Sequence, residues 1–418
     1  MQMADSAGVS IVSREGQVAA SRPEAAARGR RSVTTATPRT LRVINDAAAL
    51  QLLLEHGALS RAQLAEMTGL SKPTAAQLLT RLCDEGLVVE QGENSGAPGP
   101  NARLYAVNDR AALVAGLDVA EEHATAAVAD VTGRVLAEQR IDIDFGTDID
   151  PVPVVSQLLS DTARRGGVRL RDIDHVTLGV SAAYDVAADA LTFAGHIPGW
   201  ARPGVLGRLR KALRTDLVVD NDVNLAAVWE RRHGAAQDAG GFVLLWVGEG
   251  LGLSIDLGGA LYAGATGGAG EIGYMPLGLP GAGVTPPTFE DLAGAPAVRA
   301  LALTHGFEGS AEEAVAAARA DLSRGLPVLA ELARRLAAGL APIAAVLDPP
   351  LVVLAGATCV AGGEELVRLV SHELRAISPF DTPLALTRAP GSPVLPGALD
   401  AGLERVRASV LGIGRVRA

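Results

Sequence analysis

The sequence predicts an α/β protein in which a small helical domain with a β-hairpin precedes a larger domain of two related lobes. Of its 418 residues, 48% are hydrophobic but only 3% are aromatic. The apolar content is therefore mainly Ala, Val and Leu, as in helices and buried parallel strands. Glycine-terminated helical segments fill residues 39–86, and apolar strands alternate with helices from Ala112 onward. A chain of this length can bury several hydrophobic cores.

The composition excludes several classes of protein. Only two cysteines occur, Cys83 and Cys359, without a Cys-x-x-Cys pair. This argues against a disulfide scaffold or a cysteine-rich zinc module and is typical of a reducing compartment. No apolar run reaches the ~18 residues of a membrane span, and the first residues contain no apolar signal segment. We therefore expect a cytoplasmic protein without a membrane partner, whose residues 1–38 form a disordered tail.

Charge is distributed unevenly along the chain. The net charge is −10, yet residues 1–110 are almost neutral and the remainder carries nearly all of the negative charge. A near-neutral segment can approach a polyanion that an acidic segment repels. The asymmetry permits nucleic-acid binding by the N-terminal part without requiring it.

Residues 39–109 are predicted to form a winged helix-turn-helix. A helical pattern begins near Leu41 and stops before Gly57, and a second helix runs from Ser60 to about residue 68, with Ser60 as its N-cap. A third helix runs from Ser71 to about residue 85. Two short apolar segments, 87–89 and 104–107, flank a Gly/Pro/Asn loop at 92–102. Three helices followed by such a hairpin are typical of this DNA-binding fold.

The third predicted helix has an apolar and a polar face. Its apolar residues recur at spacings of three and four and can pack against the first two helices. Its polar residues are of the types that contact base edges or phosphate, and the hairpin adds one arginine. The candidate DNA-binding residues are Ser71, Lys72, Thr74, Gln77, Arg81 and Arg103. The alternative is a small helical domain with a solvated polar face; the order of the elements favours DNA binding.

Residues 110–418 are predicted to contain a duplicated α/β lobe. The first series has strands at 113–118, 125–130, 135–142 and 175–180, with a helix at 152–165. The second has strands at 241–247, 251–257, 261–263 and 351–354, with helices near 291–303, 311–320 and 327–347. Repetition of a three-strand series indicates duplication. We assign lobe 1 to about 110–235 plus 396–412, which includes a final helix, and lobe 2 to about 236–395.

Four stretches carry a family resemblance: SRAQLAEMTGLSKPTAAQLLTRLCDEGLV, HIPGW, VVDNDVNLAAVWE and GGALYAGATGGAGEIGY. In this order they resemble the ROK family of repressors and sugar kinases, and in particular its xylose- and N-acetylglucosamine-type repressors. The resemblance covers about residues 39–412. It implies a winged helix followed by a two-lobed actin/hexokinase-like (ribonuclease H-like) domain with a ligand cleft between the lobes. Kinase members lack the DNA-binding head, which is intact here.

The resemblance also implies that the machinery for phosphoryl transfer has been lost. Asp222 matches the family's catalytic base, but Asp118 is followed by Glu121 and Glu122 where the family has glycine and a small hydroxyl. Glu249 stands in the family's Gly-Thr-Gly loop. A carboxylate about 4 Å from a phosphate costs ~4 kcal/mol at an effective dielectric constant of 20. We therefore expect no useful ATP binding, no cofactor and no enzymatic activity, with Asp222 a vestigial base.

The family's zinc ligands are absent, but its sugar contacts are partly present. The segment MPLGLPGAGVTPPTFE after Tyr274 contains no Cys or His, whereas structural zinc needs four N or S ligands, so no metal is expected. His196 stands where many members have Asn, and Tyr274 replaces the usual His. The implied ligand-binding residues are His196, Asn221, Asp222, Glu271, Tyr274 and Glu290. Each of them alone could equally be a solvated loop or helix-cap group.

Three functions remain open from the sequence. The first is a transcriptional repressor that binds a double-stranded DNA operator and responds to a sugar or sugar derivative. As a homodimer or dimer of dimers, it would place its third helices ~34 Å apart in successive major grooves. The second is an active ATP-dependent sugar kinase with a DNA-binding head, and the third is constitutive DNA binding by an inert scaffold. The altered phosphate loops favour the first.

Overall fold

The computed structural model describes residues 38–94, 102–279 and 285–413. The predicted tail, apart from its last residue, and the tip of the predicted hairpin loop lie outside the described residues. The chain divides into two units after Arg42, and the second unit is Val43–Ala418. The elements that follow belong to the second unit, except for the start of the first helix. In the described part of the chain, no helix has the length and apolar character needed to cross a membrane.

The N-terminal elements form the predicted winged helix-turn-helix. Its helices are α1 (Pro38–His56), α2 (Arg61–Thr68) and α3 (Lys72–Asp84), and its antiparallel sheet has the order β1 (Leu59–Ser60), β3 (Ala102–Val107) and β2 (Val88–Asn94). Local signals set the helix ends: Ser60 and Gln63 form a capping box, and Gly69 ends α2 in the left-handed conformation. The buried side chains of α3 pack in the same apolar cluster as Leu50 and Leu53 of α1. The two-residue strand β1 was not predicted.

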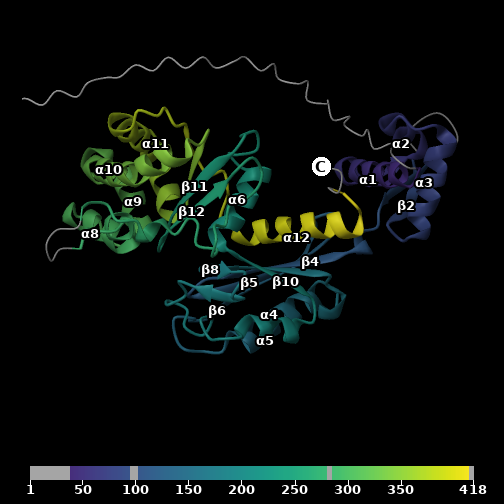
Figure 1. Ribbon diagram of the computed structural model, residues 1–418, viewed down its shortest axis with the longest axis horizontal. Helices are drawn as coiled ribbons and strands as arrows, with labels where there is room; N and C mark the ends of the chain where they lie inside the picture. The colour runs from purple at the N-terminus through teal and green to yellow at the C-terminus, as the bar shows by residue number, and fades with distance from the viewer. Residues whose placement is uncertain (1–37, 95–101, 280–284, 414–418) are drawn as a thin grey trace, which may run out of the picture. The chain divides into compact units, whose positions relative to one another are not determined.

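The next elements build a five-stranded sheet of order β10-β7-β4-β5-β6. The antiparallel strands β4 (Leu113–Val119), β5 (His123–Asp130) and β6 (Val135–Asp142) are extended by the parallel strands β7 (His175–Val180) and β10 (Asp216–Asn221). Helices α4 (Pro151–Arg165) and α5 (Val205–Leu213) cover one face. The final helix, α12 (Val394–Val410), packs on the other face beside β4, as Figure 1 shows in yellow. A Cβ at Gly116 would meet Leu395 and Leu399 at 3.2 Å, so small residues let α12 approach the sheet closely.

A second sheet has the order β12-β11-β13-β14. Its antiparallel pair is β11 (Phe242–Val247) and β12 (Leu251–Asp256), followed by the parallel strands β13 (Val352–Ala355) and β14 (Leu384–Leu386). One face packs on a large apolar cluster that includes α8 (Ala295–Thr304), α9 (Ala311–Ala320), α10 (Leu322–Leu347) and α11 (Ala357–Ile377). The other face packs on α6 (Asp222–His233), which follows β10 directly. Shorter elements are β8 (Ala183–Asp185), β9 (Ala190–Thr192) and α7 (Phe289–Ala293).

The two sheets share a pattern, but the second copy is shorter than predicted. Both contain an antiparallel pair followed by two parallel strands, β5-β4-β7-β10 and β12-β11-β13-β14. The strand predicted at 261–263 is wrong, because only one isolated bridge, between Asp256 and Leu261, forms there. Gly258 and Gly259 both adopt positive φ and turn the chain away after β12. The glycine-rich segment around Cys359 begins α11, where Cys359 is fully buried. Helix α10 also begins earlier than predicted, ahead of Pro327.

Candidate DNA-binding and ligand-binding sites

Helix α3 presents a polar surface above its buried face. Ser71 caps the helix, and its hydroxyl accepts a hydrogen bond from Thr74 N at 3.3 Å. Lys72, Thr74 and Gln77 are exposed, whereas the apolar face of the same helix is buried. Lysine provides a charge for phosphate, and glutamine provides paired donor and acceptor groups for a base edge. The first two turns of α3 therefore have the chemistry of a groove-reading helix.

Arg81 is placed differently from the other candidates on α3. Its guanidinium group forms an ion pair with Asp46 of α1. Both side chains are less than one-third exposed, at 30% and 20%. In this position Arg81 joins two helices of the domain. Removing it would therefore perturb helix packing as well as any contact with DNA.

Arg103 belongs to a hydrogen-bonded network on the hairpin. Its guanidinium group donates to both oxygens of Glu90 at 3.1 and 3.2 Å. Tyr105 donates to Glu90 at 3.2 Å and accepts from Arg61 Nε at 2.9 Å. The Arg61 guanidinium also lies 5.3 Å from the centre of the Tyr105 ring. The network thus holds Arg61 of α2 and Arg103 of β3 on one side of the domain.

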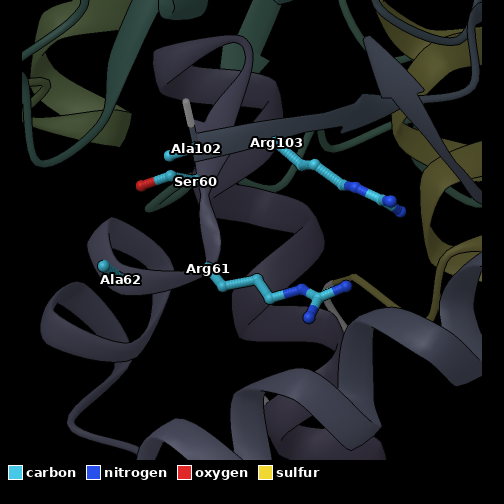
Figure 2. Close-up of a pocket in the computed structure, with 5 residues that line it drawn as sticks. All are labelled: Ser60, Arg61, Ala62, Ala102 and Arg103. Carbon is cyan, nitrogen blue, oxygen red and sulfur yellow. The ribbon is translucent and has the colours of Figure 1, made fainter. Parts of the chain in front are cut away.

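These two arginines border a hollow of about 560 Å³. Figure 2 shows their side chains extending in the same direction from the hollow. The other lining residues are Ser60, Ala62 and Ala102. Two guanidinium groups beside the start of a capped helix suit a phosphate oxygen. Sequence reasoning missed Arg61, although its place directly after the N-cap residue could have indicated it.

The segment from β10 to α6 carries two of the predicted ligand-binding residues. Asn221 is the N-cap of α6: its Oδ1 accepts from Val223 N at 2.8 Å, and its Nδ2 donates to the carbonyl oxygen of Ala182 at 3.3 Å. Asp222 is the first residue of the helix and accepts a hydrogen bond from the Ser181 hydroxyl. Burial raises the pKa of Asp222 to about 6, and the charge of Glu271 acts in the same direction. Asn221 is the N-cap of α6, but Asp222 Oδ1 also accepts from Val223 N at 2.9 Å, so the Asp222 carboxylate contributes to the start of the helix as well.

A buried carboxyl that the sequence analysis did not select lies near Asp222. Asp118, near the end of β4, is only 8% exposed. Burial raises its pKa to about 7, and the charge of Asp222 adds to this effect. The charge of Asp222 thus acts on Asp118, and the charge of Glu271 acts on Asp222. The three carboxyl groups come from three separate segments of the chain. In the sequence, Asp118 stands at the end of an apolar strand and directly before an acidic turn. This position could have indicated that Asp118 is a buried carboxyl of the site.

Asp220 has a structural role beside this group. Its carboxylate accepts from Asn221 N at 2.8 Å and from Asn224 Nδ2 at 2.9 Å. Ser254 of β12 donates to Asn224 Oδ1 at 2.9 Å. This chain of hydrogen bonds ties the start of α6 to both sheets and fixes the backbone that presents Asp222.

The remaining predicted ligand residues lie around the loop after β12. Glu271 precedes a 3-10 turn, Ile272–Tyr274, and desolvation raises its pKa. Tyr274 is 63% exposed, and its ring centre lies 5.1 Å from that of Phe193. Exposed His196 follows three residues after Phe193. This aromatic pair joins two segments that each carry candidate ligand residues.

Glu290 serves a packing role that the sequence did not reveal. Its carboxylate accepts from Leu251 N at 3.0 Å, so it joins α7 to the start of β12. A Cβ at Gly273 or Gly294 would collide with this side chain. Burial raises the pKa of Glu290. The contacts tie its carboxylate to the protein backbone next to Gly273, within the turn that carries Tyr274.

Comparison with known proteins identifies the family. The profile of the ROK family matches residues 114–377, well over half of the chain. This chain belongs to the ROK family. Residues 44–89 match the profile of a winged helix-turn-helix DNA-binding domain. The predicted order of a winged helix followed by a ROK domain is therefore confirmed.

Relatives in the ROK family include regulators and kinases. A putative xylose repressor from Caldicellulosiruptor sp. (strain Rt8B.4) is 24% identical over 238 residues, 57% of this chain and 59% of the relative. The match thus spans about three fifths of that relative's length. The crystal structure of a ROK family transcriptional regulator, a homologue of the E. coli MLC protein, aligns with a TM-score of 0.68 and 21% identity over 89% of this chain and 99% of that one.

A kinase shares the fold of the C-terminal part. The ROK hexokinase from Thermus thermophilus aligns with a TM-score of 0.57 and 24% identity, over 70% of this chain and 99% of that one. Together with the regulator structure, this confirms the predicted actin/hexokinase-like class. The fold alone does not separate a ROK regulator from a ROK kinase, so the distinction depends on the residues of the site.

In this ROK chain, carboxylates lie in the two turns where the sequence analysis expected altered phosphate loops. Glu121 and Glu122 are exposed in the β4–β5 turn, which Ala120 N closes by donating to the His123 carbonyl at 3.0 Å. Glu249 is exposed in the β11–β12 turn, where Gly248 N donates to the Gly250 carbonyl at 3.1 Å. Among the residues that the structure describes, no group of three or more His, Cys, Asp or Glu could hold a metal ion.

Proposed function

We propose that this ROK protein is a transcriptional repressor that binds an operator through its winged helix and a sugar-like ligand through its two-lobed domain, without transferring phosphate. The observation that carries the proposal is the polar surface of α3, with Lys72, Thr74 and Gln77 exposed above a buried apolar face. An exposed polar face is common to surface helices, but here it lies on the third helix of a segment, residues 44–89, that matches the profile of a winged helix-turn-helix DNA-binding domain. The same chain has acidic residues at both phosphate turns, which supports a binding role for its ROK domain.

The DNA-binding surface would combine base readout with phosphate contacts. Gln77 would read a base edge in the major groove, while Lys72, Arg61 and Arg103 would contact phosphates beside it. In a homodimer two such surfaces would bind half-sites one helical turn, ~34 Å, apart. The nearly neutral N-terminal region tolerates this approach, because most of the negative charge lies in the rest of the chain.

The ligand site would use Asp222 and Glu271 to accept hydrogen bonds from hydroxyl groups. Both side chains are partly desolvated, since burial raises the pKa of each. Hydroxyl-rich ligands need such convergent acceptors. Ligand binding would alter DNA affinity by favouring one arrangement of the two lobes. The name of the xylose repressor relative supports a carbohydrate as the ligand class.

One observation favours the alternative, an active sugar kinase. Asp222 is retained, and a pKa of about 6 suits a group that removes a proton near neutral pH. Against it, Glu249 stands in a turn where backbone N–H groups would have to surround phosphate oxygens. Without bound phosphates, a positioned base has no transfer reaction to assist.

DNA binding can be tested before the operator sequence is identified. The full-length protein would select binding sequences from random double-stranded DNA, and fluorescence anisotropy would then measure its affinity for the selected site. We expect Lys72→Ala to weaken binding and to reduce the salt dependence by about one phosphate contact. Arg299→Ala, which removes an exposed arginine of α8, is the control and keeps wild-type affinity. Selection of no preferred sequence would contradict the proposal.

Two further measurements test the C-terminal domain. Isothermal titration with D-xylose, D-glucose and N-acetylglucosamine should detect binding of at least one of them, and this sugar should change the affinity for DNA. A coupled ADP-release assay with the same sugars and MgATP should show no turnover above background. Turnover that disappears in Asp222→Asn would establish the kinase alternative instead.

A further inference from the structure

An aromatic pair borders the candidate ligand site and belongs to neither sheet. Phe193 directly follows β9, and Tyr274 ends the turn that Glu271 begins. Their ring centres lie 5.1 Å apart with a tilt of 42°. Phe193 is 48% exposed and Tyr274 is 63% exposed. Two aromatic side chains in contact thus leave much of their apolar surface in water.

The backbone holds this pair in place from both sides. Phe193 has φ of 57°, a left-handed conformation that a bulky side chain rarely adopts. Backbone strain of this kind persists only where surrounding contacts enforce it, and it is often found at ligand sites. A Cβ at Gly268 would lie 3.6 Å from the Phe193 ring, so the loop after β12 passes beside it.

The same loop is attached to the hairpin β8–β9. Gly267 has φ of +78°, and any Cβ there would collide with the main chain of Tyr184 in β8. The Gly270 carbonyl accepts from Leu253 N of β12 at 3.0 Å. The loop therefore packs against β8 while it remains bonded to β12. These contacts fix Phe193 and Tyr274 relative to each other.

Polar acceptors lie next to the pair in the chain and in space. Glu271 and Tyr274 are three residues apart across a 3-10 turn, and side chains at this spacing lie one above the other. The charge of Glu271 is close enough to Asp222 to raise its pKa. On the other side, the segment between β7 and β8 supplies Ser181, which donates to Asp222. The aromatic surface and the carboxylates therefore border the same region.

We propose that Phe193 and Tyr274 form an aromatic platform that stacks on the apolar ring face of a pyranose, while Glu271 and Asp222 accept hydrogen bonds from its hydroxyls. The inference rests on the proposed function and specifies its ligand as a cyclic sugar. A pyranose ring has faces of C–H groups and an edge of hydroxyls, which match an apolar platform beside acceptors. An acyclic polyol has the same hydroxyls but no rigid apolar face. The aromatic platform should therefore bind the cyclic sugar more tightly than an acyclic polyol.

The test compares each sugar with its own reduced form. Isothermal titration of the full-length protein would use D-xylose with xylitol, and D-glucose with glucitol. Wild type should bind one aldose at least about tenfold more tightly than its alditol. Each of the substitutions Phe193→Ala and Tyr274→Ala should weaken binding of the aldose by about tenfold, because it removes one of the two apolar surfaces beneath the sugar ring. Both should also reduce the preference for the ring.

Conservative variants separate stacking from a structural role. Phe193→Tyr and Tyr274→Phe keep the rings and should retain affinity within about threefold. Val186→Ala, which truncates an exposed side chain of the same hairpin, should bind like wild type. A urea-unfolding transition like that of the wild type in all variants would show that the domain carrying the substitutions folds.

The outcomes distinguish the two proposals. If wild type binds an aldose and the two alanine variants bind it equally well, the platform is refuted while the proposed ligand class stands. Equal affinity of wild type for aldose and alditol also refutes the platform. If wild type binds none of these sugars, both the ligand class and the platform fail, whereas DNA binding stands on its own measurement.

Discussion

Replacing Asp118 by Asn should stabilise the protein at alkaline pH. Asp118 is 8% exposed, and burial, aided by the charge of Asp222, raises its pKa from 3.8 to about 7. Ionisation of this carboxyl is therefore unfavourable in the folded protein. Asparagine has nearly the same shape and cannot ionise, so it removes the electrostatic cost without leaving a cavity.

The size of the effect follows from the pKa. One pH unit of difference between the folded and unfolded pKa corresponds to about 1.36 kcal/mol, so a difference of about three pH units corresponds to about 4 kcal/mol. Between about pH 4 and 7 the folded state retains a proton that the unfolded state has lost. The free energy of unfolding of the wild type therefore falls as the pH rises through this window and levels off above it. Asp118→Asn lacks the ionisable carboxyl, so this pH-dependent loss of unfolding free energy is absent in the variant.

Urea unfolding of wild type and Asp118→Asn at several pH values between about 4.5 and 8.5 tests this reasoning. At about pH 8 the variant should be more stable by about 2 to 4 kcal/mol, and the difference should shrink to about 1 kcal/mol or less at about pH 4.5. Asp238→Asn, at an exposed carboxyl, serves as the control and should follow the wild-type profile. Equal pH profiles for wild type and Asp118→Asn would refute the assignment of a buried, mainly neutral Asp118.

Three further predictions concern the DNA-binding head and the helix packing. Gln77→Ala should reduce discrimination at one base pair of the selected operator by about 1 to 3 kcal/mol, measured by anisotropy on single-base variants. Arg81→Ala and Asp46→Ala should each lower the free energy of unfolding, with a coupling energy of up to about 1 kcal/mol in a double-mutant cycle, because they share an ion pair. Gly397→Ala should lower the free energy of unfolding by about 1 to 3 kcal/mol, measured by urea unfolding, because the new Cβ collides with a main-chain oxygen of α6.

Each of these predictions has a result that contradicts it. A uniform loss of affinity across all operator variants would make Gln77 a nonspecific contact. Additive effects of Arg81→Ala and Asp46→Ala would show that their ion pair contributes nothing measurable. Gly391→Ala has open space around its Cβ and is the control for Gly397→Ala. Equal stability of the two alanine variants would show that α6 and α12 are not packed as closely as described.

The winged helix was predicted well because its signals are local. Ser60 and Ser71 cap the helices they precede, and Gly69 adopts the left-handed conformation that ends α2. Each of these interactions joins residues within a few positions of one another, so they can be read along the chain. The two-residue strand β1 has no such signal, because it exists only by pairing with Tyr105 and Leu104 of β3.

Glycine was a less reliable signal in the second lobe. Gly258 and Gly259 do form a turn, but the strand expected after them has only one bridge. Gly362 and Gly363 lie inside α11, where Gly363 forms a kink. Buried residues such as Leu366 and Val370 pack this helix against the core. Tertiary burial there outweighs the low helix propensity of glycine.

The sequence by itself determined the order of the domains, the helix caps and the identity of most polar groups, since these depend on neighbouring residues and on motif order. Only the tertiary structure joined Arg81 to Asp46, placed Asp118 near Asp222, and paired Phe193 with Tyr274. Each of these pairs comes from segments far apart in the chain. Their interactions depend on distance and burial, which arise only when the sheets and helices pack.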